Sequence, residues 1–215
     1  MTSIRTLTRR AALLAVTATA ALTLAACGGD SGDDSSSSPS SASSSASSAG
    51  AGAKAEAGAH NAQDVSFAQG MIPHHQQALE MAGLAADRAS SAQVKDLAAR
   101  IEKAQDPEIK TMTGWLKGWG EDVPESMPGM DHSAHSGMAG MMDPGDMEKL
   151  EKASGKEFDT MFLTMMVEHH EGAVEMATTE KSKGEYTDAK SMADDIVTAQ
   201  NAEIEEMNKL LGKKG

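Results

Sequence analysis

Apolar residues recur at helical spacing in four stretches of this chain. Two of the stretches contain a His-His pair, and each of these is followed by a stretch whose apolar positions also fall three or four residues apart. Short breaks near Ser90 and Gly184 predict tight turns between antiparallel helices. A longer passage rich in Gly and Pro separates the two pairs of helices. The pattern therefore predicts an all-α protein built from two helical hairpins.

The two halves of this pattern repeat one another at an offset of 95 residues. Between residues 64–116 and 159–211, eighteen of fifty-three aligned positions are identical without a gap. The matched positions include Phe67, Met71, His74, His75 and Met81, which align with Phe162, Met166, His169, His170 and Met176. Such an alignment indicates the duplication of one supersecondary unit.

The duplication sets the expected domain organisation. Two copies of a helical hairpin predict a four-helix bundle over residues 60–215. Repeat 1 is expected at about 60–119 and repeat 2 at about 146–212, with a long Met/His-rich loop at 120–145 between them.

The His-His pairs are expected on the inward face of their helices. The matched methionines and histidines share one helical face with apolar residues, so they should point to the interior. A buried histidine is usually a hydrogen-bonded core residue, and a buried methionine usually fills space. Four imidazoles in two matched pairs favour a metal site instead, because each needs a partner when it is buried. The predicted ligands are Met71, His74, His75, Met81, Met166, His169, His170 and Met176, and their spacing leaves open whether they form one shared site or two.

The passage between the repeats carries further candidate ligands. A solvated linker has no packing reason to contain so many methionines, although its backbone is expected to be a low-complexity loop. Thioethers and imidazoles without cysteine favour Cu(I), with silver as a candidate substitute, and imidazole with carboxylate can also hold Cu(II). The predicted loop ligands are Met127, Met130, His132, His135, Met138, Met141 and Met142.

The N-terminus has the features of an export signal followed by a lipid attachment site. Three arginines precede an apolar run too short to span a membrane, which predicts a signal peptide at 1–26. The single cysteine, Cys27, follows a Leu-Ala-Ala sequence that resembles a bacterial lipobox. We therefore expect Cys27 to carry lipid, residues 27–59 to form a disordered Ser/Gly/Ala tether, and the protein to be anchored to the membrane outside the cytoplasm. The export route, Sec or twin-arginine, is left open.

The chain is acidic, with 19 basic and 32 acidic residues and a formal net charge of −13. Removal of residues 1–26 would take away three arginines and no acids, which leaves 16 basic residues and a net charge near −16. This balance argues against nucleic acid as a partner. It suits the binding of cations.

The doubled Met-x-x-His-His motif, at Met71 to His75 and at Met166 to His170, resembles that of a secreted family called domain of unknown function 305, which includes CopM-like copper-binding proteins. The resemblance covers about residues 61–211. It implies a ferritin-like four-helix bundle, copper binding and a role in copper tolerance.

We therefore predict an extracytoplasmic copper-binding lipoprotein that sequesters copper or hands it on. No catalytic residue is expected, and a copper exporter or chaperone is a candidate partner. Imidazole ligands with ordinary pKa values would make copper binding weaken below about pH 6.

Two alternatives to copper storage are kept open. The first is a ferritin-like di-iron oxidoreductase, which is disfavoured because Glu168 and Glu171 beside the second His pair correspond to Pro73 and Gln76 beside the first, so the carboxylates are not symmetric. The second is an envelope interaction or sensor protein without a metal, in which the histidines act as pH-sensitive core groups.

Overall fold

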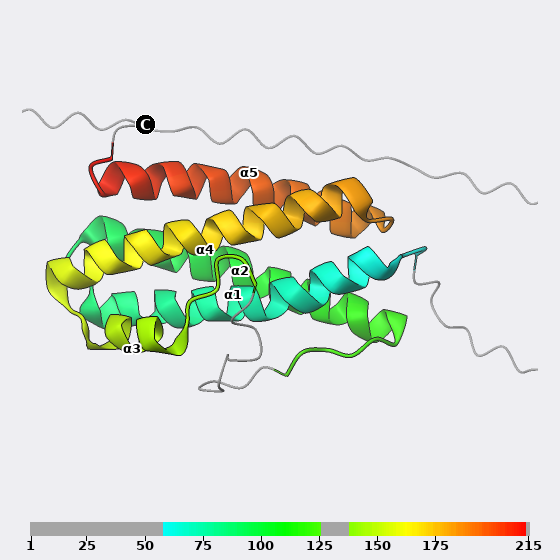
Figure 1. Ribbon diagram of the computed structural model, residues 1–215, viewed down its shortest axis with the longest axis horizontal. Coiled ribbons are helices and arrows are strands. Elements are labelled where there is room, and N and C mark those ends of the chain that lie inside the picture. The colour runs from blue at the N-terminus through cyan, green and yellow to red at the C-terminus, as the bar shows by residue number, and fades with distance from the viewer. Residues whose placement is uncertain (1–57, 126–137, 214–215) are drawn as a thin grey trace, which may run out of the picture. The chain divides into compact units, whose positions relative to one another are not determined.

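The computed structural model describes residues 58–125 and 138–213, and all the elements in these ranges are helices. They are shown in Figure 1 and are, in chain order, α1 (Ala62–Arg88), α2 (Ala92–Trp119), α3 (Pro144–Lys152), α4 (Gly155–Lys183) and α5 (Thr187–Leu210). α1 packs along α2, and α4 packs along α5. The two hairpins meet mainly through α1 and α4. The predicted all-α fold with two hairpins is confirmed.

Several predictions concern residues that the structure does not describe. These are the signal peptide at 1–26, Cys27, all but the end of the tether, and the loop ligands Met127, Met130, His132 and His135. Among the described helices, none combines the length and the apolar character needed to cross a membrane.

The ends of the long helices follow local sequence signals. α1 begins after Asn61, whose side chain accepts hydrogen bonds from the first turn while Asp64 bonds back to the Asn61 N–H. α2 ends at Gly120, which adopts the positive φ of 81° that favours glycine at a helix end. Pro73 and Pro107 lie inside α1 and α2 without ending them. The turns within the hairpins, at residues 89–91 and 184–186, lie where the sequence predicts them.

The short helix α3 was not predicted. It lies at the junction between the expected loop and the second repeat. Asp143 caps it by accepting a hydrogen bond from the Asp146 N–H, and Pro144 occupies its first position. The Asp-Pro sequence is thus a helix start signal, although the helix that follows is too short to show an amphipathic pattern. Leu150 buries the apolar side of α3 in the core.

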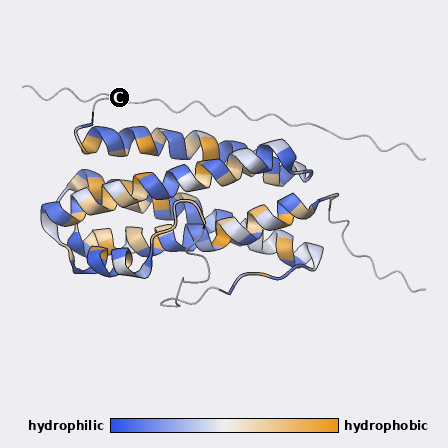
Figure 2. Cartoon of the chain, viewed as in Figure 1, coloured by the Kyte–Doolittle hydropathy of each residue, from blue (hydrophilic) through white to orange (hydrophobic). Residues whose placement is uncertain are grey.

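Two apolar clusters form the core, one toward each end of the hairpins. The cluster beside the α1–α2 turn includes Leu97, Ile101, Phe158 and Phe162. The cluster beside the α4–α5 turn includes Phe67, Ile72, Leu116 and Ile196. Figure 2 shows how apolar and polar residues alternate around each long helix, as expected for helices with one buried face. The four histidines of α1 and α4 lie between the two clusters.

The hairpins hold one another through an exchange of aspartates. Asp64 of α1 accepts hydrogen bonds from the backbone N–H groups of Glu185 and Tyr186 in the α4–α5 turn, at 3.1 and 2.9 Å. At the offset of 95 residues, Asp159 of α4 accepts hydrogen bonds from the N–H groups of Ser90 and Ser91 in the α1–α2 turn, both at 3.0 Å. Each carboxylate therefore fixes the first helix of one hairpin against the turn of the other.

Candidate metal centre

The four histidines of the repeated motif are buried where the two hairpins meet. His74, His75 and His170 are 0% exposed, and His169 is 1% exposed. The rings of His74 and His169 lie with their centroids 3.7 Å apart and their planes 40° apart. These two residues occupy equivalent positions in the two repeats. The structure therefore brings one histidine of each motif together between the hairpins. The spacing of the motifs alone left open whether the two would share one site.

Neither ring of this central pair has a hydrogen-bond partner. Both nitrogens of His74 and both nitrogens of His169 are buried without one. The Ala139 backbone lies near the His74 ring and the His74 backbone near the His169 ring, and each favours the protonated form, although neither contact meets the geometry of a hydrogen bond. Buried polar atoms without partners cost free energy. Ring nitrogens in this condition are free to act as metal ligands.

The other two histidines each bond a glutamate. The His75 Nε2 lies 2.7 Å from the Glu108 Oε2, and the His170 Nε2 lies 2.8 Å from the Glu203 Oε2. In the neutral form of either ring, the carboxylate acceptor places the proton on Nε2 and leaves the Nδ1 lone pair for a ligand. Both Nδ1 atoms are buried without a hydrogen-bond partner. Each imidazole is thus oriented by an outer carboxylate in the way that histidine metal ligands usually are.

Sequence reasoning missed the roles of Glu108 and Glu203. Both glutamates were identical positions of the duplication, and each follows its histidine by 33 residues. Gln105 and Gln200 precede them by three residues, are almost fully buried, and have side-chain oxygens without partners. The repeated Gln-x-x-Glu of α2 and α5 was the signal that could have identified this outer layer.

The central imidazoles are neutral in the folded protein. Burial, with the nearby His75 as the next cause, lowers the pKa of His74 to about 3. Burial also holds the pKa of His169 well below its ordinary value, with His74 as the next cause. The expected competition from protons near pH 6 is therefore wrong for His74, because its folded ring resists protonation down to much lower pH.

The predicted methionines fall into two groups. Met71, Met81 and Met166 are fully buried, and Met71 and Met166 each precede a central histidine by three residues on the same helix. Met176 is half-buried on α4. A Cβ atom on Gly70 would lie 3.6 Å from the Met176 Sδ and 3.7 Å from the Met138 Sδ, so these two thioethers converge beside α1.

The remaining two described loop methionines precede α3. Met142 is 7% exposed, whereas Met141 is half-buried. The end of the Met/His-rich passage therefore packs on the hairpins close to the central histidines, since Met142 joins the same apolar cluster as Met81 and Met166.

The donor set suits a soft cation better than a hard one. Within the described residues, no three His, Cys, Asp or Glu side chains are arranged to hold a metal ion by themselves. A metal between the hairpins would therefore use imidazole nitrogens together with thioethers. That combination favours Cu(I) over Mg²⁺ or Ca²⁺, which take oxygen ligands.

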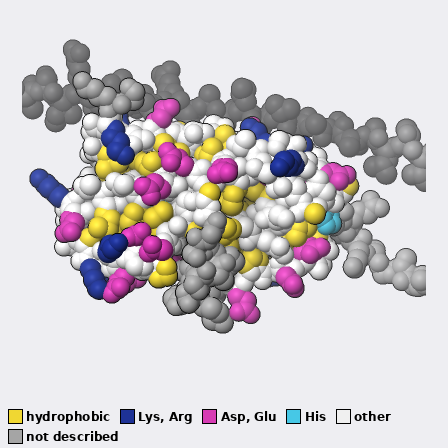
Figure 3. Space-filling model, viewed as in Figure 1, with side chains coloured by type: hydrophobic (Ala, Val, Ile, Leu, Met, Phe, Trp, Pro, Cys, Tyr) yellow, Lys and Arg dark blue, Asp and Glu magenta, His cyan; other side chains and the backbone are white. Residues whose placement is uncertain are grey.

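The two His–Glu pairs differ in their access to solvent. Glu108 lines a cleft of about 390 Å³ between α2 and α5, together with Asp188 and Asp195. At the equivalent place beside Glu203, Arg100 replaces Asp195 and forms an ion pair of 2.7 Å with Glu206 across α2 and α5. Among the described residues, the acidic cleft thus borders the first pair. Figure 3 shows many acidic side chains on one face of the molecule, in keeping with the net charge.

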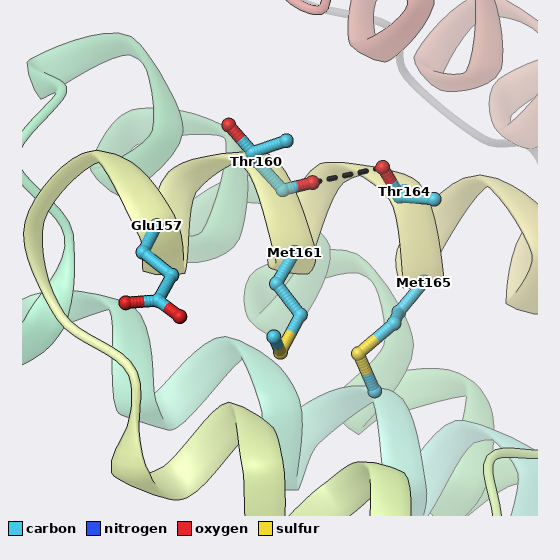
Figure 4. Close-up of a pocket in the computed structure, with 5 residues that line it drawn as sticks. All are labelled: Glu157, Thr160, Met161, Thr164 and Met165. Carbon is cyan, nitrogen blue, oxygen red and sulfur yellow. Dashed lines mark hydrogen bonds between the residues drawn. The ribbon is translucent and has the colours of Figure 1, made fainter.

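A second pocket contains methionines that were not predicted as ligands. It has a volume of about 460 Å³ and is lined by Glu157, Thr160, Met161, Thr164 and Met165, all on α4. Figure 4 shows Met161 and Met165 pointing to the same side of this helix. The first repeat has Ser66 and Gly70 at the equivalent positions. This pocket is therefore not part of the duplicated arrangement.

The fold and the buried residues together define a class of all-α hairpin proteins with nitrogen- and sulfur-rich interiors. The chain belongs to the DUF305 family, a domain of unknown function whose sequence profile matches residues 64–211. No curated protein matches the chain.

Several solved structures are similar to this chain. A DUF305 protein from Streptomyces coelicolor, provisionally described as secreted, is 35% identical with a TM-score of 0.63, and the match covers 71% of this chain and 96% of that one. A DUF305 fragment from Deinococcus radiodurans is 30% identical with a TM-score of 0.63 over 71% and 97% of the two chains. CopM in its Cu(II)-bound form is 35% identical with a TM-score of 0.59 over 69% and 95%. CopM is also known in Cu(I)-bound and Ag-bound forms.

Proposed function

We propose that this protein binds copper outside the cytoplasm and either sequesters it or hands it on. The observation that carries the proposal is the meeting of His74 and His169, whose neutral rings lie 3.7 Å apart without hydrogen-bond partners. The similarity to CopM, which binds copper and silver, supports the same function.

We assign the inner ligands to both hairpins. His74 and His169 would supply ring nitrogens, and the buried thioethers of Met71 and Met166 would complete a soft donor set. Imidazoles that are already neutral need no deprotonation before they bind a metal. The two tilted rings would have to separate slightly to admit an ion between them.

The outer ligands extend this site toward solvent. His75 and His170, oriented by their glutamates, offer Nδ1 atoms that suit Cu(I) or Cu(II). Met81, Met176 and the loop methionines and histidines would capture the ion or pass it on. Silver would follow the same thioether route, since it shares the preference of Cu(I) for soft donors.

The rest of the proposal concerns the setting of the site. The hairpins would form a ferritin-like bundle, tethered to the membrane through lipid on Cys27, with a copper exporter or chaperone as partner. The protein would carry copper as cargo and would not be an enzyme. The observation that favours storage over oxygen chemistry is that Glu108 and Glu203, the outer carboxylates, each bond a histidine.

A titration of the metal-free protein with Cu(I), Cu(II), Ag(I), Fe(II) and Zn(II) tests this function. The double variant His74→Leu with His169→Leu should weaken Cu(I) binding by more than the roughly 10–100-fold that changes to outer residues typically cause. His60→Leu is the matched control, because His60 stacks on Trp119 at the end of the molecule. Unchanged Cu(I) binding in the double variant, or a preference for Fe(II), would refute the assignment.

A further inference from the structure

The segment at residues 138–142, which we call the strap, crosses between the two hairpins. In Figure 1 it is the yellow-green trace that leads from α4 across α1 to α3. On α4 the strap lies directly on Gly172, where a Cβ atom would come within 2.0 Å of the Ala139 carbonyl oxygen. Gly140 has a φ of 81°, and a Cβ there would lie 2.7 Å from the Glu168 carbonyl oxygen. Glycine at both positions therefore permits backbone to pack on backbone.

On α1 the strap is held by a single side chain. Gln77 is fully buried and bonds both backbone groups of Met142. Its Nε2 donates to the Met142 carbonyl oxygen at 2.9 Å, and its Oε1 accepts from the Met142 N–H at 2.8 Å. Both polar groups of the amide are thus used on the strap. A buried pair of bonds of this kind acts as a latch, because releasing it leaves two polar groups without partners.

The latch occupies the place where the duplication is broken. Gln77 and Gly172 are equivalent positions at the offset of 95 residues. One repeat supplies a long polar side chain that grips the strap, and the other supplies no side chain, so that the strap fits. His74 and His169 each precede these positions by three residues, on the same helices. The strap therefore lies beside the central histidine pair, in keeping with the closeness of Ala139 to His74.

We propose that the strap is the gate of the histidine site, latched by Gln77, and that a soft cation enters or leaves when this latch releases. The inference rests on the proposed function and adds its regulation. Met138 lies at the edge of the gate, where its thioether and that of Met176 both lie beside Gly70. A Cu(I) or Ag(I) ion released from the imidazoles would meet these two thioethers next. Opening of the gate would thus expose the histidine site next to the thioethers of Met138 and Met176.

Gln77→Ala tests the gate in two measurements on the whole protein. In the metal-free protein, hydrogen exchange at the Met142 amide should become about tenfold faster or more, since two buried hydrogen bonds are lost. In the Cu(I)-loaded protein, transfer of Cu(I) to a competing chelator should accelerate by a similar factor, with the number of bound ions unchanged. Gln69→Ala is the matched control, because Gln69 also lies on α1 but donates to a backbone carbonyl outside the strap, that of Asp122.

Gly172→Ala displaces the same strap from the opposite side and should accelerate Cu(I) transfer as well. Hydrogen exchange in α2 and α5 should stay at the level of the unaltered protein, which shows that the variants remain folded. A Cu(I) transfer rate that ignores both substitutions, while the Met142 amide exchanges faster, would overturn the gate and leave the copper function intact. Failure of the unaltered protein to bind Cu(I) at all would overturn the proposed function and the gate together.

Discussion

His74 and His169 are 95 residues apart in the chain, yet their rings lie 3.7 Å from centroid to centroid between the two hairpins. Neither ring has a hydrogen-bond partner, and both are buried. A fold selected for stability alone would place apolar residues here, because two unpartnered imidazoles are costly to bury. A ligand that binds the folded state alone would recover that cost, since its binding energy adds to the stability of the fold. We therefore expect the folded protein to be most stable when a ligand is bound between the two rings.

Replacing both rings by leucine should make the metal-free protein more stable. The double variant His74→Leu with His169→Leu removes four polar atoms that have no partners, and we expect a gain of about 1–3 kcal/mol in the free energy of unfolding. Urea unfolding in the presence of a chelator measures the change. His60→Leu, which alters a ring stacked on Trp119, should give no such gain. Destabilisation by the double variant would mean that the two imidazoles are well satisfied in the folded state.

The stability of the metal-free protein should fall more steeply with acid than that of this leucine variant. Burial lowers the pKa of His74 to about 3, and it also lowers the pKa of His169. The unfolded chain takes up protons on these rings below about pH 6.5, whereas the folded protein does not. Each ring then removes up to about 1.4 kcal/mol per pH unit as the pH falls from 6.5 to 5. Equal slopes in the two proteins over this window would show that the folded rings titrate normally.

The sequence was enough to predict the hairpins and the burial of the four histidines, because both follow from helical periodicity. The outer glutamates were visible in the alignment but carried no assigned role. Periodicity places Glu108 on a partly polar helix, and only packing shows that it reaches His75. The central pairing of His74 with His169 depends on how two hairpins dock, which no spacing within one helix encodes.

Other features that escaped prediction break the repeat. In the sequence, Gln77 and Gly172 are only one of many differences between the two copies. In the structure, Gln77 bonds the strap and Gly172 leaves room for it. α3 was missed because nine residues are too few for a periodic pattern to stand out. Differences between the repeats were thus as informative as identities. Their role became clear only from the strap, which packs against both copies.

The exchanged aspartates should contribute similar stability from opposite ends of the molecule. Asp159→Ala removes the acceptor for the Ser90 and Ser91 N–H groups, and we expect a loss of about 1–2 kcal/mol, as for other helix and turn caps. Thermal and urea unfolding measure this loss. Asp146→Ala, which removes a carboxylate exposed on α3 and paired with Lys149, should cost much less. A loss no larger than that of the control would show that the turn does not depend on Asp159.

A buried carboxyl at the other end of the molecule breaks the symmetry of this exchange. Glu180 is 0% exposed and lies beside Asp64, whereas the first repeat has Ala85 at the equivalent position. Burial, together with the neighbouring Asp64 carboxylate, raises the pKa of Glu180 to about 8, while Gln63 and Lys190 oppose the shift. The pKa of Asp64 is lowered although burial acts against this, because backbone N–H groups donate to its carboxylate and the Glu180 carboxyl lies beside it. Glu180 is thus the protonated partner of an Asp64 anion.

Glu180→Gln should abolish a loss of stability that accompanies rising pH. Between pH 4.5 and 8 the unfolded chain releases the Glu180 proton while the folded protein keeps it, so stability falls as the pH rises through this range. Between pH 6.5 and 8 the loss amounts to as much as about 2 kcal/mol. Glutamine keeps a donor for Asp64 and has no charge to bury, so the variant should be more stable than the natural protein at pH 8 and comparable to it at pH 5. Urea unfolding at both pH values measures the difference, with Glu175→Gln on the exposed side of α4 as the control. A variant that is less stable than the natural protein at pH 8 would contradict a protonated Glu180, because it would mean that an ionised Glu180 is already well accommodated beside Asp64.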